Sequence, residues 1–382
     1  MKMLKIVADD KIPFLRGVLE PFAEVKYLPG GKITNSDLRD ADALITRTRT
    51  KCGPELLENT AVKFIASATI GYDHIDTRYC GSKGICWTNA PGCNSESVAQ
   101  YMTSLLLDRA RRAGMALDGK VIGVVGVGNV GSKVARNARA LGMKVLLNDP
   151  PRARKEGPDG FVPIEQIRRE ADIITFHVPL ISDGEDATWH YAGASFFEQL
   201  GKRPFVINAS RGEVCDNAAL KQALRNGQLA GAALDVWENE PEIDLDLLAL
   251  LDYATPHIAG YSADGKCNGT AMSVLALVKF FGLEEKFDRS VLQRPSLPEH
   301  GVIDLMPYFR AGERDQELLY RAVTAAYDIV SDDRRLRGDP GSFEKQRGNY
   351  PLRREFDSYQ VLSPEKLTGI LREMRFKTVK GD

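Results

Sequence analysis

Apolar residues recur along the chain in short runs that alternate with longer segments of helical periodicity. The runs are short and rich in Val, Ile and Ala, which is typical of buried strands in a parallel sheet. This pattern predicts strands at residues 4–8, 25–28, 43–46, 64–69, 121–125, 143–147, 173–176, 205–210, 230–236 and 253–255. It predicts helices at 12–21, 95–113, 132–141, 164–170 and 217–226, and a long helix from about 273. The alternation indicates an α/β fold.

The pattern changes beyond about residue 290. Pro295, Pro298 and Pro307 predict a linker or an irregular lead-in. The spacing of apolar residues predicts an amphipathic helix over 313–330, and 343–350 is also helical in pattern. Between them, residues 332–341 are charged and end in Pro and Gly, which favours a loop.

One stretch combines a strand, a glycine turn and a helix. The apolar run 121–125 leads directly into Gly126-Val127-Gly128-Asn129-Val130-Gly131, which matches G-x-G-x-x-G. In a dinucleotide site Gly126 would allow the tight turn, Gly128 the approach to the pyrophosphate, and Gly131 the packing of helix on strand. The free amides at the start of the helix would face the phosphates. The alternative is a tight turn without a ligand, but the surrounding strand and helix favour dinucleotide binding.

An acidic residue lies where the next predicted strand ends. Asp149 follows the run 143–147 and can accept hydrogen bonds from the adenosine ribose. A carboxylate there repels a 2′-phosphate, so it favours NAD over NADP. Arg152 and Arg154 follow closely and could weaken that preference. The prediction remains NAD.

Three polar residues follow three predicted strands. Arg211, Glu240 and His257 lie just beyond 205–210, 230–236 and 253–255. Since ligands of doubly wound sheets bind beyond the carboxyl ends of strands, we expect these side chains to converge over the cofactor. Arginine clamps a carboxylate, histidine exchanges a proton near neutral pH, and a carboxylate fixes the imidazole tautomer. Each residue alone has a structural explanation, but together they predict a site for oxidising a hydroxy acid.

Two further features of the first ninety residues have competing interpretations. The loop from Thr46 to Lys51 mixes hydroxyls with three cations, so an anion site and a solvated basic loop are equally supported. His74 follows Asp73 where a helix is capped, which favours a structural role over catalysis.

Composition narrows the class of protein. A length of 382 residues predicts two or three domains, and 43% hydrophobic with 27% charged residues is typical of a globular protein. A formal net charge of −1 gives no general attraction to nucleic acid or anionic membranes. No signal peptide or membrane span is expected. The six cysteines form no C-x-x-C pair, which argues against disulfides or a metal site and for a cytoplasmic protein.

Four segments, at 126–131, 208–212, 235–241 and 256–260, resemble the signatures of the D-2-hydroxyacid dehydrogenases in their order. The resemblance covers about residues 1–285. It implies that Arg211, Glu240 and His257 are the catalytic residues, with His257 as the base while hydride leaves C2 for NAD. It also implies a Rossmann-type doubly wound cofactor domain, residues 95–261. This domain would be inserted in a flavodoxin-like substrate domain, residues 1–94 and 262–285, with a hinge between them.

A second set of segments, at 91–94, 148–152, 257–261 and 347–355, resembles one branch of that family. Its members oxidise 4-phospho-D-erythronate to 3-hydroxy-2-oxo-4-phosphobutanoate in pyridoxal 5′-phosphate (vitamin B6) biosynthesis. The resemblance implies a homodimer and a C-terminal α+β dimerisation domain over 286–382. It implies NAD contacts at Gly126, Gly128, Asn129, Val130, Gly131, Asp149, Val178, Asp235 and Gly260. It implies substrate contacts at Thr48, Thr69 and Tyr261, and Arg47 is a further candidate.

Two of these positions depart from the branch's pattern. The family often has a serine where Thr48 stands, which keeps the hydroxyl, and Val178 replaces a polar residue, so only its backbone can contact NAD. The alternatives are another dehydrogenase of the family, acting on phosphoglycerate or hydroxypyruvate, and a NAD-sensing interaction protein on the same fold.

Overall fold

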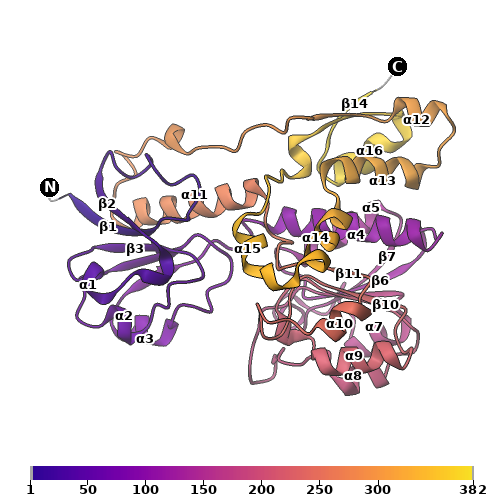
Figure 1. The fold of residues 1–382 in the computed structure, drawn as a ribbon, viewed down its shortest axis with the longest axis horizontal. Coiled ribbons are helices and arrows are strands. Elements are labelled where there is room, and N and C mark those ends of the chain that lie inside the picture. The colour runs from indigo at the N-terminus through magenta and orange to yellow at the C-terminus, as the bar shows by residue number, and fades with distance from the viewer. Residues whose placement is uncertain (1–2, 381–382) are drawn as a thin grey trace. The chain divides into compact units, whose positions relative to one another are not determined.

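The computed structural model describes residues 3–380, which form two compact units (Figure 1). One unit holds the residues up to Asn94 together with Ser262–Ser296, and the other holds Ser95–Tyr261 together with the residues from Leu297 onward. The sequence predicts a separate C-terminal domain from 286. In the structure this part of the chain shares a hydrophobic core with Ser95–Tyr261, because Leu318 and Leu371 pack in the same cluster as Val98 and Val134.

The first unit contains a five-stranded parallel sheet in the order β2-β1-β3-β4-β5, as expected for a flavodoxin-like domain. Its strands are β1 (Leu4–Asp9), β2 (Ala23–Leu28), β3 (Ala43–Thr46), β4 (Phe64–Ser67) and β5 (Cys86–Thr88). Its helices are α1 (Asn35–Leu38), α2 (Pro54–Leu57), α3 (Thr77–Ser82) and α11 (Ala263–Phe280).

Two helix predictions in this unit need correction. The predicted helix 12–21 is wrong, because the segment forms successive turns in which Phe14 and Gly17 take φ values of +62° and +84°. Neither value belongs to a right-handed helix. The long helix expected from about 273 begins earlier, at Ala263, where the Ser262 side chain accepts a hydrogen bond from the amide of Gly265.

The second unit is built on a six-stranded parallel sheet in the order β11-β10-β9-β8-β6-β7. Its strands are β6 (Val121–Val125), β7 (Lys144–Asn148), β8 (Ile173–Phe176), β9 (Phe205–Asn208), β10 (Gly231–Leu234) and β11 (Tyr253–Ala254). Helix α4 (Ser95–Arg112) precedes the first strand. The helices between the strands are α5 (Gly131–Ala140), α6 (Pro150–Glu156), α7 (Ile164–Glu170), α8 (Ala194–Glu198), α9 (Asn217–Arg225) and α10 (Leu245–Leu250). Successive residues of β8, Ile173 and Ile174, enter two different cores, so both faces of this sheet are covered. The predicted doubly wound architecture is confirmed.

The C-terminal part of this unit adds a small parallel sheet in the order β12-β13-β14. Its elements are β12 (Val302–Asp304), α12 (Met306–Arg310), α13 (Asp315–Ala326), α14 (Ile329–Gly338), α15 (Phe343–Gly348), β13 (Gln360–Ser363), α16 (Glu365–Glu373) and β14 (Lys377–Lys380). None of the helices within residues 3–380 is long and apolar enough to cross a membrane.

The predicted helix 313–330 ends at Ala326, and the loop prediction for 332–341 is wrong because most of it belongs to α14. The Asp328 side chain caps the new helix by accepting from the amide of Val330. The charges that suggested a loop form pairs one turn apart, with the Arg337 Nε 2.9 Å from the Asp333 Oδ1. Such pairs stabilise a helix.

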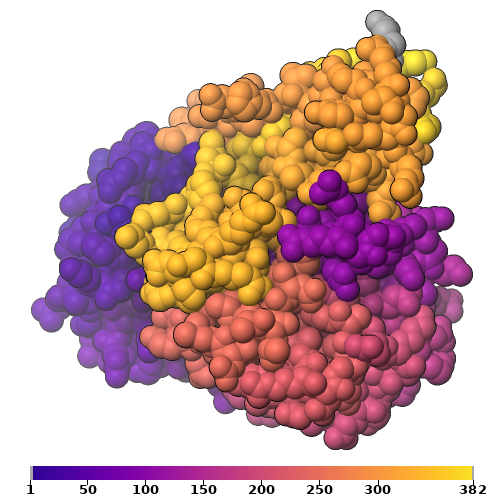
Figure 2. All heavy atoms as spheres, turned by 45° about the vertical axis from the view of Figure 1, so that its right-hand side comes forward, coloured from indigo at the N-terminus to yellow at the C-terminus, as the bar shows by residue number. Residues whose placement is uncertain are grey.

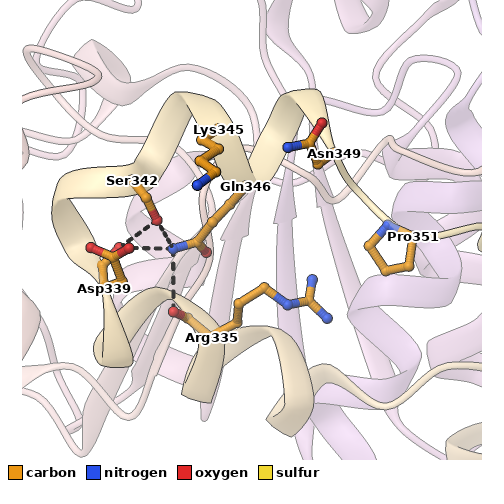
Figure 3. A pocket seen from close by; sticks show the side chains of 7 residues that line it. All are labelled: Arg335, Asp339, Ser342, Lys345, Gln346, Asn349 and Pro351. Carbon is orange, nitrogen blue, oxygen red and sulfur yellow. Dashed lines mark hydrogen bonds between the residues drawn. The ribbon is translucent and has the colours of Figure 1, made fainter.

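Side chains fix α14 and α15 against the rest of this unit. Arg337 donates to the carbonyls of Leu248 and Leu251, at the end of α10, over 2.8 Å each. The Nε2 of Gln346 donates to the carbonyls of Arg335 and Asp339 and to the hydroxyl of Ser342 (Figure 3). α14 therefore packs on β11 and α15 is bonded to α14, and in the space-filling view the residues near 340 lie against those near 250 (Figure 2).

Candidate active site

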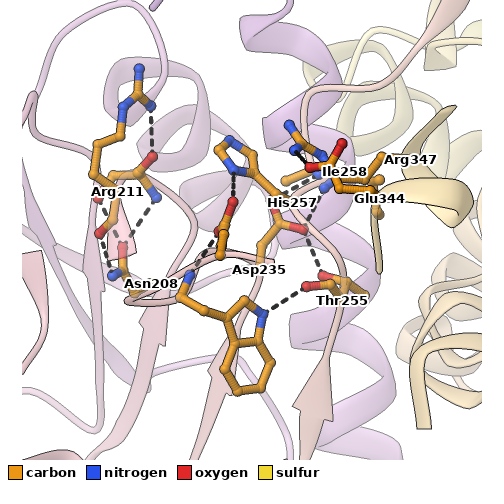
Figure 4. A network of polar contacts seen from close by, with 12 residues as sticks. Asn208, Arg211, Asp235, Thr255, His257, Ile258, Glu344 and Arg347 are labelled. Atoms are coloured by element: carbon orange, nitrogen blue, oxygen red, sulfur yellow. Dashed lines mark hydrogen bonds and ion pairs between the residues drawn. The ribbon is translucent and has the colours of Figure 1, made fainter. Parts of the chain in front are cut away.

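The three residues predicted to be catalytic follow β9, β10 and β11, which are neighbours in the sheet. The His257 Nδ1 lies 2.8 Å from the Glu240 Oε2, and the amide of Trp237 donates to the Glu240 Oε1 over 2.9 Å (Figure 4). Arg211 lies beside them, with its Nη1 donating to the carbonyl of Ser210 over 2.8 Å. The imidazole keeps 32% of its side-chain surface exposed, so a substrate can reach it.

The protonation state of Glu240 decides how it holds the imidazole. Burial raises the pKa of its carboxyl. The hydrogen bond and charge of His257, the Trp237 amide and the charge of Arg347 lower the pKa by more than burial raises it, so the net pKa lies below the ordinary value. Glu240 is therefore ionised at neutral pH and can only accept. The Nδ1 of His257 must then donate to it, which leaves the Nε2 for a proton on the substrate.

The backbone at His257 is held in an unusual conformation. Its φ is +55°, in the left-handed region that non-glycine residues rarely adopt, and its amide donates to the Asp235 carbonyl over 2.7 Å. The Asp235 carboxylate is 2% exposed and accepts from the amides of Ile258 and Ala259 and from the hydroxyl of Thr255. Burial raises the pKa of Asp235 above its ordinary value despite these donors.

Asp235 thus has a supporting position that the sequence did not indicate. The resemblance implies a contact with NAD, which stays a prediction, and in the structure three hydrogen bonds also tie its carboxylate to the turn that carries His257. Such ties can hold a strained backbone at a functional site. No signal in the sequence distinguishes this role from a ligand contact.

A glycine brings the Arg211 and Glu240 loops together. A Cβ on Gly212 would lie 2.0 Å from the carbonyl oxygen of Trp237, far inside van der Waals contact. Only glycine permits this approach, so the Arg-Gly pair in the sequence is explained by the loop that lies against it.

The glycine loop meets the requirements of a dinucleotide site. Gly126 has φ of +86° and a Cβ there would lie 2.5 Å from the His177 carbonyl and 2.7 Å from the Val178 side chain. A Cβ on Gly131 would lie 1.9 Å from the carbonyl of Gly126. By contrast, a Cβ on Gly128 would meet nothing within 4 Å, so its backbone is open to a ligand. In the first turn of α5 the amides of Ser132 and Lys133 donate to the carbonyls of Gly128 and Val130. The positive end of the helix dipole, which follows Asn129 and Val130, suits a pyrophosphate.

Asp149 supports this loop from the end of β7. Its carboxylate accepts from the amides of Val127, over 2.8 Å, and Arg152, over 3.1 Å. Each oxygen retains a second lone pair that a ribose hydroxyl can use. The Arg152 guanidinium pairs with Glu156, and Arg154 pairs with two other acids. Both arginines that could attract a 2′-phosphate are held by carboxylates, which favours NAD.

The candidate substrate residues of the first unit lie beyond two neighbouring strands. Thr46 and Ser67 are register partners that end β3 and β4, and Thr48 and Thr69 stand two residues past them. The Thr69 hydroxyl lies 2.8 Å from the hydroxyl of Ser67, while Thr48 is exposed. Arg47, in the same loop as Thr48, donates to the carbonyl of Lys11.

His74 is adjacent to this edge of the sheet. Its Nε2 lies 3.3 Å from the Ser67 hydroxyl, and burial lowers its pKa to about 4 against the opposing charge of Asp73. A neutral, half-buried imidazole with a protein partner agrees with the structural interpretation of this residue.

Tyr261 lies close to His257. Its amide donates to the Ile258 carbonyl over 2.9 Å, closing a turn that contains Gly260. The ring of Tyr261 contacts Tyr350, at a centroid distance of 6.0 Å. A residue from the C-terminal segment therefore reaches the neighbourhood of the active site, which the sequence did not indicate.

Comparison with known proteins agrees with this geometry. The family model of the D-isomer specific 2-hydroxyacid dehydrogenase NAD binding domain matches residues 95–259. Residues 308–373 match the model of a domain of unknown function. The fold resembles solved 3-phosphoglycerate dehydrogenase from Entamoeba histolytica bound to NAD⁺, with TM-score 0.64 and 25% identity over 75% of this chain and 98% of that one. It also resembles D-lactate dehydrogenase from Aquifex aeolicus, with TM-score 0.60 and 26% identity over 74% and 97%.

Curated relatives match nearly the whole chain. The erythronate-4-phosphate dehydrogenase of Bacteroides thetaiotaomicron is 49% identical over 94% of this chain and 99% of its own length. That of Porphyromonas gingivalis is 44% identical over 98% and 100%. The fold, the glycine loop and the His257–Glu240 pair define an NAD-dependent dehydrogenase, and the chain belongs to the D-isomer-specific 2-hydroxyacid dehydrogenase family. Within it, the erythronate-4-phosphate dehydrogenases are the branch to which the sequence is similar from end to end, as the tail predicted.

Proposed function

We propose that the protein oxidises 4-phospho-D-erythronate to 3-hydroxy-2-oxo-4-phosphobutanoate with NAD, as a step of pyridoxal 5′-phosphate biosynthesis. The observation that carries this proposal is the match of 49% identity over 99% of a relative named for that substrate. That match covers 94% of this chain, whereas the two solved dehydrogenases of other substrates cover 74% and 75% of it.

The chemistry of the proposal follows from three side chains. The Nε2 of His257 takes the proton of the C2 hydroxyl, and Glu240, bound to the Nδ1, stabilises the resulting imidazolium. The guanidinium of Arg211 binds the substrate carboxylate and polarises the C2 oxygen. When bound, NAD supplies the two-electron oxidant for the C2 carbon.

The remaining contacts are proposed from the resemblance and from the positions described above. The residues proposed to hold NAD are Gly126, Gly128, Asn129, Val130, Gly131, Asp149, Val178, Asp235 and Gly260. The residues proposed to contact the substrate are Thr48, Thr69, Tyr261 and Arg47.

The first experiment measures turnover of 4-phosphoerythronate, 3-phosphoglycerate and erythronate with NAD and a 2-oxo acid that regenerates it. We expect a strong preference for 4-phosphoerythronate. A preference for 3-phosphoglycerate would keep the mechanism but refute the proposed substrate. No turnover of any of the three, together with NAD-dependent binding of a protein partner, would indicate a NAD-sensing protein.

A variant separates catalysis from cofactor binding. His257→Ala should lower kcat about 10²- to 10⁴-fold, the usual contribution of a general base. Its affinity for NAD, measured by fluorescence titration, should change little. His300→Ala is the matched control, because this histidine is exposed and should leave both quantities unchanged. Normal turnover of the His257 variant would contradict the assignment.

We also propose that the protein forms a homodimer through its C-terminal segment. Exposed large apolar residues support this proposal, because half of those within residues 3–380 lie in this segment: Leu297, Val302, Tyr308, Phe309, Leu352 and Val379. Exposed apolar surface concentrated in one segment favours an interaction surface there. Sedimentation analysis should give twice the chain mass of 42.2 kDa for the wild type. A monomer at micromolar concentration would refute the dimer.

A further inference from the structure

A second arginine lies beside the catalytic histidine. Arg347, on α15, stands on the opposite side of His257 from Arg211 (Figure 4). Its guanidinium carbon lies 5.6 Å from the ring centroid of Tyr261, the residue that follows the turn after His257. The C-terminal segment thus brings a fixed positive charge to the active site of its own chain.

The bonding of Arg347 is incomplete. Its Nη1 donates to the Glu344 Oε1 over 2.8 Å, but its Nε is buried and has no hydrogen-bond partner. A buried donor without an acceptor is costly, so such a group needs an explanation. The charged and titratable groups that act on this arginine are Glu344, Tyr261 and Glu240, and Phe343 packs near it. One ion pair with Glu344 leaves most of the guanidinium donors available.

We propose that Arg347 binds the phosphate of the substrate, while Arg211 binds the carboxylate. The inference rests on the proposed function. The reacting C2 carbon must lie at His257, and the substrate carries one anion on each side of C2. Two guanidinium groups on opposite sides of the imidazole match this charge pattern, since arginine binds both carboxylate and phosphate in a bidentate way.

This assignment gives the C-terminal segment a role in substrate selection. A dehydrogenase of this fold without α15 would lack the second cation at this position. The alternative is that Arg347 only fixes Tyr261 or adjusts the charge of Glu240. In that case its loss would impair the oxidation of phosphorylated and unphosphorylated substrates equally.

The test compares Arg347→Gln with Lys345→Gln. Lys345 lies on the same helix and is exposed, so its variant removes one positive charge away from the site. We expect Arg347→Gln to raise the KM for 4-phosphoerythronate about ten- to a hundredfold, as the loss of a charged hydrogen bond does. Its kcat/KM for erythronate should stay within about threefold of the wild type. Lys345→Gln should match the wild type on both substrates.

Inorganic phosphate provides a second readout that does not depend on turnover of erythronate. It should inhibit the wild type competitively against 4-phosphoerythronate, and its inhibition constant should rise by a similar factor in Arg347→Gln. Thermal unfolding and NAD binding of the variant, unchanged from wild type, confirm that it is folded. Arg347→Lys should recover part of the lost affinity, because it restores the charge without the planar fork.

The outcomes separate the two proposals. If the wild type does not oxidise 4-phosphoerythronate, the proposed function fails and the inference fails with it. If the wild type does so and Arg347→Gln has an unchanged KM and phosphate inhibition, only the inference is overturned. An equal loss on both substrates, with phosphate inhibition unchanged, would also overturn it and assign Arg347 a positioning role.

Discussion

The second and third glycines of the 126–131 loop, Gly128 and Gly131, should respond differently to substitution by alanine. Gly131→Ala adds a Cβ that would lie 1.9 Å from the carbonyl oxygen of Gly126, whereas the Cβ of Gly128→Ala would meet nothing within 4 Å. Contacts between non-bonded heavy atoms are favourable at about 3.5 Å or more. Backbone atoms must therefore move by more than about 1 Å in the Gly131 variant.

The cost of Gly131→Ala in free energy of unfolding can be bounded from this geometry. Forcing extra carbon into a packed region costs about 1–3 kcal/mol. Gly131 is the first residue of α5, so part of the gain of about 1 kcal/mol for alanine over glycine in a helix offsets this cost. We expect the free energy of unfolding to fall by about 1–2 kcal/mol. Because the shift separates the loop from α5, NAD affinity should fall as well.

The assay is urea unfolding of the apoprotein together with NAD titration of both variants. Gly128→Ala should unfold within about 0.5 kcal/mol of the wild type, as exposed substitutions do, yet bind NAD more weakly because its methyl group points where the pyrophosphate approaches. Equal stabilities of the two variants would refute the packing argument. Wild-type NAD affinity in Gly128→Ala would refute the proposed path of the pyrophosphate.

Two further predictions concern buried groups. Asp235→Ala leaves the amides of Ile258 and Ala259 and the hydroxyl of Thr255 without their acceptor, so urea unfolding should show a loss of about 3 kcal/mol; a loss near zero would show that water replaces the carboxylate. Burial lowers the pKa of His177 to about 3. Because this lies below the unfolded value of about 6.5, the unfolded state binds the extra proton, and stability should fall as pH drops from about 6.5 toward 3. His177→Leu should show a weaker pH dependence over that window in urea titrations at each pH, and an identical one would contradict the assignment.

The sequence predicted the sheets well because their strands are buried on both faces. Runs such as 121–125 and 173–176 match β6 and β8 at both ends. It failed where local composition and tertiary packing disagree. The charges of 332–341 suggested a loop, but the Arg337–Asp333 pair and the contacts of α14 with the core favour a helix. Opposite charges spaced one helical turn apart occur both in loops and in helices, so they indicate a helix only once the segment is known to pack on the core.

The pattern of residues along the chain was enough to predict the chemistry of this protein. The glycine fingerprint and the positions of Arg211, Glu240 and His257 after strands predict what is bound and which groups act, because strand ends of a parallel sheet meet at one edge. How those groups are held depends on packing between segments distant in the chain. Asp235 anchors the turn that carries His257. Helix α15 brings Arg347 to the same turn, although Arg347 lies ninety residues beyond His257 in the chain. Such contacts depend on the packing of segments distant in the chain, which no local pattern of residues records.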